Sequence, residues 1–122
     1  MATRDVDAFG EAWLNAWNRR DLDAILAHYA DDIEQQSPVA AGILGDPSGR
    51  VVGKSNLREY FRKVLDAIPG DLELRILGVY QGVGTLVVHF QAKGARGAEY
   101  LELNADGRVR RAAAHILMVS DT

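Results

Sequence analysis

The 122-residue sequence contains no cysteine. Disulfide bonds, thiolate nucleophiles and cysteine-ligated zinc are therefore excluded. No apolar run reaches the roughly 20 residues that a membrane-spanning helix requires, and the first residues do not resemble a signal peptide. We therefore expect a cytoplasmic protein without a membrane partner.

The sequence also lacks an excess of positive charge. Its formal net charge is −3, whereas nucleic acids and anionic membrane surfaces select for a basic face. Neither is expected as a partner. Apolar residues make up 48% and charged residues 25% of the chain, as in ordinary folded domains. A chain of this length can bury one core but not two, so we expect a single domain over residues 1–122.

In the first half, apolar residues recur at the three- and four-residue spacing of amphipathic helices. The first helix ends at the Asn18-Arg19-Arg20 corner, and Asp21 is placed to cap a second, shorter helix with Tyr29 on its buried stripe. A third helix ends at Pro69-Gly70. Before it, the segment Val39–Arg50 is rich in turn-forming residues and predicts a mobile loop that could cover a pocket.

The second half alternates as β-strands do, with turn signals between the strands. An earlier strand, with Ile33, Gln35 and Ser37 on one side, is expected to end at Pro38. The later strands begin at Leu72, and Gly78 is a candidate for a β-bulge in the first of these. The last strand, Val109–Val119, has small or apolar residues on both faces. His89 and His115 lie on the parity opposite the core. These features predict a homodimer that forms through the outer face of the sheet.

Four groups of residues carry a resemblance to a known family: Trp17-Asn18 through Asp21, the Tyr29-Ala30-Asp31-Asp32 corner, Gly49-Arg50-Val51-Val52-Gly53 leading into Leu57, Tyr60 and Phe61, and Asp106-Gly107-Arg108-Val109. With the order of elements, they make the chain resemble the nuclear-transport-factor-two-like superfamily, including its SnoaL-like and steroid-isomerase-like branches. The resemblance implies an α+β fold in which a cone-shaped, curved antiparallel sheet wraps around three helices from the N-terminal half and encloses an apolar pocket.

Combined with the strand parities, the resemblance implies a set of residues that line the pocket and bind a small apolar or ring-shaped ligand. They are Trp13, Trp17, Gln35, Ser37, Tyr60, Phe61, Leu65, Leu86, Val88, Phe90, Glu99, Leu101, Ala112, Ala114 and Ile116. Trp13 and Trp17 could stack on the ligand or belong to the packed core. Gln35 and Ser37 could orient a polar group of the ligand, or bind each other or a buried water.

Steroid isomerases of this superfamily use a carboxylate base, together with a tyrosine and a protonated aspartic acid that stabilise the enolate. The position of the base corresponds to Ser37 here. The position of the tyrosine corresponds to Trp13, and that of its supporting tyrosine to Phe61. Only the position of the protonated acid, Glu99, keeps an acidic residue. Because the base and both tyrosines are missing, ordinary steroid-isomerase chemistry is not expected.

Glu99 shares a strand face with Leu101 and Leu103, so burial would raise its pKa and suit it to acid–base catalysis. The alternative is a position at the rim of the pocket, paired with Arg96. At the level of function, an isomerase-, cyclase- or lyase-like enzyme and a non-catalytic binding or interaction module both remain open. We expect no cofactor. We also expect no metal site, because His28 and Asp32 have no third ligand nearby.

Overall fold

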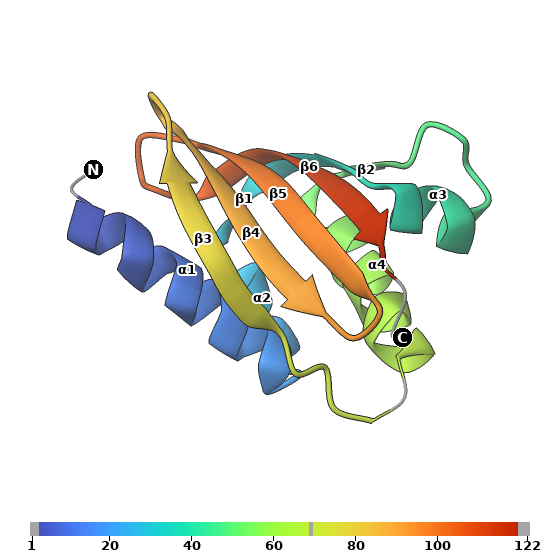
Figure 1. Cartoon of the computed structure of the whole chain (residues 1–122). Helices are drawn as coiled ribbons and strands as arrows, with labels where there is room; N and C mark the ends of the chain where they lie inside the picture. The colour runs from blue at the N-terminus through green and yellow to red at the C-terminus, as the bar shows by residue number, and fades with distance from the viewer. Residues whose placement is uncertain (1–2, 69, 120–122) are drawn as a thin grey trace.

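The computed structural model describes residues 3–68 and 70–119. Four helices and six strands are formed (Figure 1). In chain order they are α1 (Thr3–Asn18), α2 (Leu22–Leu26), β1 (Tyr29–Gln36), α3 (Pro38–Leu44), β2 (Arg50–Val52), α4 (Lys54–Ala67), β3 (Arg75–Gln81), β4 (Thr85–Ala92), β5 (Ala95–Leu103) and β6 (Val109–Met118).

The six strands form one curved sheet in the order β2-β1-β6-β5-β4-β3. Neighbouring strands are antiparallel, except for β1 and β6, which run parallel. The inner face of the sheet curves over α1 and α4, and the outer face is turned toward the viewer in Figure 1. The predicted α+β fold with a cone-like sheet is confirmed.

The corner between α1 and α2 joins the N-terminal helices to the end of α4. Asp21 caps α2 as predicted, because its carboxylate accepts a hydrogen bond of 3.1 Å from the backbone N–H of Ala24. The Arg20 guanidinium donates to the backbone carbonyls of Leu65, at 2.8 Å, and Ile68, at 2.6 Å. These bonds reach carbonyls at the C-terminal end of α4, where the Leu65 carbonyl also accepts the N–H of Ile68 at 3.3 Å.

The expectation of a mobile loop over Val39–Arg50 is wrong for its first half, which forms α3. Ser37 caps this helix by accepting a 3.0 Å hydrogen bond from the Val39 N–H, and Pro38 follows in the first turn, where its missing N–H costs nothing. Ala40 is fully buried and anchors the helix. Local capping therefore outweighs the turn-forming composition of the segment.

The start of β1 differs from the sequence prediction, whereas the bulge in β3 agrees with it. Tyr29 begins β1 instead of ending the second helix, because the chain already pairs with β6 there: the His28 carbonyl accepts from the Val109 N–H at 2.8 Å. The predicted bulge at Gly78 is confirmed by a register shift between Ile76 and Gly78.

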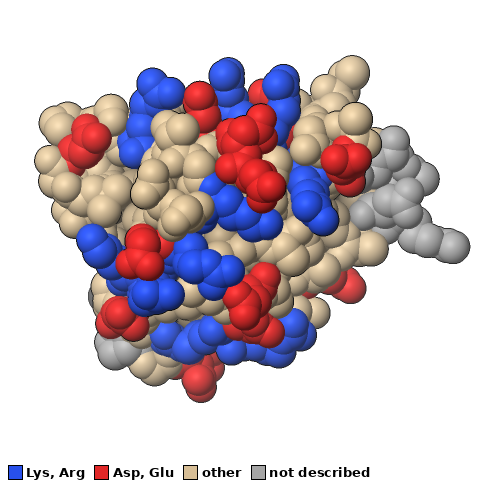
Figure 2. All heavy atoms as spheres, turned by 180° about the vertical axis from the view of Figure 1, so that it is seen from behind, with Lys and Arg blue, Asp and Glu red and all other residues tan. Residues whose placement is uncertain are grey.

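The face covered by the helices carries acidic and basic side chains intermingled (Figure 2). Ion pairs there join Arg58 to Asp23 at 2.8 Å and Arg62 to Glu59 at 3.1 Å. Intermingled charges of this kind are typical of a surface that faces water. None of the described helices is long and apolar enough to cross a membrane.

Candidate functional site

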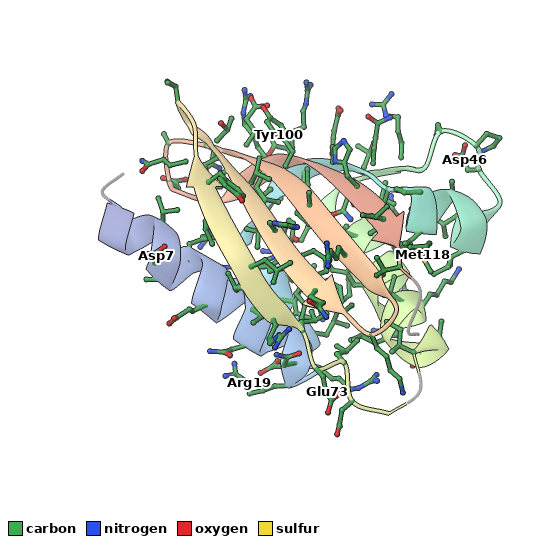
Figure 3. All side chains as sticks on the ribbon, viewed as in Figure 1. Asp7, Arg19, Asp46, Glu73, Tyr100 and Met118 are labelled. Atoms are coloured by element: carbon green, nitrogen blue, oxygen red, sulfur yellow. The ribbon has the colours of Figure 1, made fainter. Side chains whose placement is uncertain are left out.

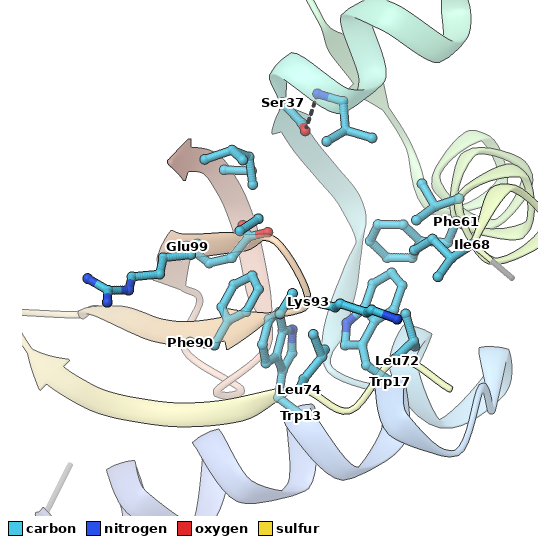
Figure 4. A pocket seen from close by; sticks show the side chains of 18 of the residues that line it. Trp13, Trp17, Ser37, Phe61, Ile68, Leu72, Leu74, Phe90, Lys93 and Glu99 are labelled. Carbon is cyan, nitrogen blue, oxygen red and sulfur yellow. Dashed lines mark hydrogen bonds between the residues drawn. The ribbon is translucent and has the colours of Figure 1, made fainter. Parts of the chain in front are cut away.

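A cavity of about 500 Å³ lies between the inner face of the sheet and the helices α1 and α4 (Figure 4). Its walls are mainly apolar. They are formed by α1, the inner side of α4, β1 and the strands β4 to β6. The turn between β4 and β5, the segment after α4, the start of α3 and the end of β6 surround the mouth. A volume of this size suits a small organic molecule.

The register of the strands gives the depth of the cavity. Leu101 pairs with Leu86 and Ala112 in a row that is fully buried. One step nearer the mouth, Glu99 lies opposite Val88 and Ala114. Because the deeper row is filled with packed side chains, Glu99 lies at the floor of the open space.

The structure brings most of the predicted lining residues together. Ten of them border the cavity: Trp13, Trp17, Gln35, Ser37, Tyr60, Phe61, Phe90, Glu99, Ala114 and Ile116. Five do not: Leu65, Leu86, Val88, Leu101 and Ala112. Four of these five are packed in the floor row or below it with at most 2% of their surface exposed, while Leu65 is half-buried on α4. Parity identifies the face of a strand but not how deeply that face is filled.

Aromatic rings pack together along one side of the cavity. The centroid of the Trp13 ring lies 5.6 Å from that of Phe90 and 6.4 Å from that of Trp17. The centroid of the Trp17 ring lies 4.8 Å from that of Phe61. Both tryptophans therefore belong to the packed core and also border the open space. The Trp17 Nε1 is buried and has no acceptor among the described residues.

Ser37 and Tyr60 place a hydroxyl pair in the cavity wall. The Tyr60 Oη lies 3.4 Å from the Ser37 Oγ, which already accepts the N–H that caps α3. Two hydroxyls have two protons, and their mutual bond uses one, so the other remains available to a ligand. Burial raises the pKa of Tyr60, which keeps its phenol protonated.

Glu99 points into the cavity (Figure 4). It keeps some accessible area because it borders the open space, but its carboxyl group lies among protein atoms and away from bulk water. Desolvation raises its pKa from 4.5 to about 7. Arg96 follows the opposite parity on β5, and no ion pair joins it to Glu99 in the described part of the chain.

Tyr29 does not line the cavity but contacts Trp13 and Phe61 of its wall, and the sequence reasoning missed this position. It is buried at the start of β1, where its Oη accepts a 3.2 Å hydrogen bond from the Trp13 Nε1. Burial and, secondarily, the negative charge of Glu99 raise the pKa of Tyr29. The sequence did contain a signal for this position. If the strand through Ile33 is extended back to Tyr29, the two residues fall on the same face, and Ile33 is on the buried face.

The histidines lie away from the cavity lining. His28 lies in the turn before β1 and packs edge-on against Phe9 at 5.2 Å, and burial lowers its pKa. Asp32 lies within β1, so the helix face that the two were expected to share is not formed. Within residues 3–68 and 70–119, no group of three or more acidic or histidine side chains could hold a metal ion.

The model of the SnoaL-like domain family matches residues 10–121, nearly the whole chain. The protein therefore belongs to the SnoaL-like family. A solved SnoaL-like protein of unknown function from Burkholderia thailandensis is 38% identical to it, with a TM-score of 0.89 over 95% of this chain and 97% of that chain. The superfamily resemblance found in the sequence is confirmed.

More distant solved structures share the fold. A putative ketosteroid isomerase from Kribbella flavida is 19% identical over 98% of this chain and 83% of that chain, with a TM-score of 0.69. AclR, a putative hydroxylase from Streptomyces galilaeus, is 20% identical over 95% of this chain and 91% of that chain, with a TM-score of 0.71. At this level of identity the likeness concerns the fold alone. The sequence has no match among curated proteins.

The raised pKa of Glu99 predicts a pH-dependent stability. Between the unfolded value of 4.5 and the folded value of about 7, the folded protein holds a proton that the unfolded chain has lost, so stability falls as pH rises through this range. The Glu99→Gln variant, which remains neutral, should match the parent at low pH. At pH 8 it should be more stable by on the order of 2 kcal/mol, measured by urea unfolding.

Glu102→Gln on the same strand is the control. Parallel pH profiles for the parent and Glu99→Gln would contradict a desolvated Glu99.

Proposed function

We propose that this protein binds an apolar, ring-containing small molecule in the cavity, and that Glu99 transfers a proton to or from it. One observation carries the proposal: a carboxyl group faces a mainly apolar cavity of about 500 Å³, and none of the ion pairs among the described residues includes it. Leaving a carboxyl unpaired away from water costs stability. A carboxyl that titrates near neutral pH can both accept and donate a proton.

The chemistry that fits this arrangement is proton transfer beside a carbonyl group. The Glu99 carboxylate takes a proton from a carbon next to the carbonyl. The electrons of that C–H bond form a carbon–carbon double bond, and the carbonyl electrons move onto the oxygen. In this proposal the free proton of the Ser37–Tyr60 pair hydrogen-bonds such an oxygen. Protonated Glu99 then returns the proton to a different carbon of the enolate, which completes an isomerase-like step.

The second candidate function is ligand binding without catalysis. It is favoured by Ser37, Trp13 and Phe61, which occupy the positions where steroid isomerases have a base and two tyrosines. In this case Glu99 would serve as a hydrogen-bonding group for the ligand. The two functions differ in whether loss of the Glu99 proton-transfer group removes turnover or only weakens binding.

Hydrogen–deuterium exchange separates these functions. The bicyclic ketone 2-tetralone carries acidic C–H groups beside its carbonyl, and its exchange in D₂O is followed by proton NMR. The protein should accelerate the exchange, with a rate that rises as pH passes through about 7 and the carboxylate forms. Glu99→Gln should lower the catalysed rate by about a hundredfold or more, whereas Glu102→Gln should not. A Glu99→Gln variant as active as the parent would remove Glu99 from the mechanism.

We also propose that two copies associate through the outer face of the sheet. Tyr100 lies on this face of β5 (Figure 3), paired with Val87 and Ala113. In the next row, His89 pairs with Ala98, which pairs in turn with His115, so small and aromatic side chains occupy the centre of the face. By contrast, the helical face carries intermingled charges (Figure 2). A face of this composition can meet a copy of itself about a two-fold axis.

Analytical ultracentrifugation tests this assembly. At tens of micromolar the protein should sediment at twice its chain mass of 13.3 kDa. Ala98→Glu would bury like charges opposite each other at the interface and should yield the single-chain mass. Lys63→Glu, an exposed change on α4, should leave the dimer intact. A parent protein that sediments at 13.3 kDa would exclude the dimer at this concentration.

A further inference from the structure

Gly97 lies directly below an aromatic ring in the cavity wall. It pairs with Phe90 on β4 and with Ile116 on β6, one step nearer the mouth than Glu99. A Cβ atom added to Gly97 would lie 2.2 Å from the Cζ of Phe90 and 2.5 Å from its Cε1. These distances are far below van der Waals contact. The far edge of the Phe90 ring therefore occupies the place that any other side chain at position 97 would need.

Backbone conformation does not explain this glycine. Gly97 has no positive φ, unlike seven other glycines of the described chain, so its backbone angles suit other residues. The pairing with β4 and β6 also passes through Gly97 without a register shift. What requires glycine at this position is the room that it leaves for Phe90.

The space into which Phe90 could move is the cavity. Its ring is the end of a side chain with two rotatable bonds, it packs against Trp13 on one side, and it borders the open volume. A side chain at position 97 would drive the ring into that volume without breaking the sheet. The fold would tolerate the change, but the cavity would shrink.

The volume of the cavity can be compared with the volume of an aromatic ring. A cavity of about 150 Å³ holds one benzene molecule, so about 500 Å³ has room for roughly three such rings. A displaced Phe90 ring would leave room for roughly two.

We propose that Gly97 is the residue that sets the size class of the ligand: by letting Phe90 lie against β5, it admits a compound of up to three fused rings to the floor at Glu99. This inference rests on the proposed binding of a ring-containing ligand. It adds that the upper size limit is set by the Gly97–Phe90 pair and not by the floor residues.

The test compares two flat aromatic probes, quinoline with two fused rings and acridine with three, at pH 8 by isothermal titration calorimetry. The parent should bind both. Gly97→Ala should weaken acridine binding by about tenfold or more and leave quinoline binding within about twofold. Adding Phe90→Leu to Gly97→Ala should restore acridine binding, because the leucine side chain is shorter. Gly42→Ala, in α3 with nothing within 4 Å of the added Cβ, is the matched control and should bind like the parent.

The outcomes separate this inference from the proposed function. Equal weakening of both probes by Gly97→Ala, or no weakening of either, would overturn the role of Gly97 while leaving ligand binding in place. A parent protein that binds neither probe would overturn the ring-containing ligand and the size class together. A crystal structure of Gly97→Ala gives an independent readout: a Phe90 ring moved into the cavity supports the inference, and an unmoved ring with a displaced β5 contradicts it.

Discussion

The fold and the site both depend on a chain of ring contacts that holds the curved sheet to the helices. Trp13 joins α1 to β4 through Phe90, Trp17 joins α1 to α4 through Phe61, and Phe61 in turn meets Tyr29 of β1. Large rings bury much apolar surface, so these contacts contribute strongly to the core. They fill one side of the cone. Beyond them the cone is left open, where Gly97 and Ala114 leave room beside Glu99.

Glu99 lies at the boundary between the filled and open parts, and this position determines its chemistry. One row deeper, a carboxyl group would be enclosed by packed side chains and out of reach of a ligand. Nearer the mouth, it would be hydrated and would titrate as an ordinary glutamate. At the floor it has lost bulk water but still borders the open volume. The same desolvation that costs stability makes the group useful for proton transfer, a trade common at functional sites.

Periodicity in the sequence predicted the helices, the strands and the face of each strand that points inward, because these depend on local spacing. Glu99 and Phe90 were placed on the inner face by the strand parities, and Ala114 by these parities together with the superfamily resemblance. The depth of the cavity could not be predicted, because it depends on how side chains from α1, α4 and the sheet fill a shared volume. For this reason Val88 and Leu101 were expected to line a space that lies above them. Helix α3 was missed because Gly42 and the turn-forming residues after the helix indicated a loop. The Gly97–Phe90 fit is visible only in three dimensions.

The central claim is that Glu99 carries a proton near neutral pH because the cavity keeps its carboxyl group from bulk water. Carbon-13 NMR of protein labelled at the glutamate side-chain carboxyl measures this directly, with the Glu99→Gln variant used to assign the resonance. The account predicts a titration midpoint near 7. A midpoint near 4.5, the ordinary value for this side chain, would contradict it.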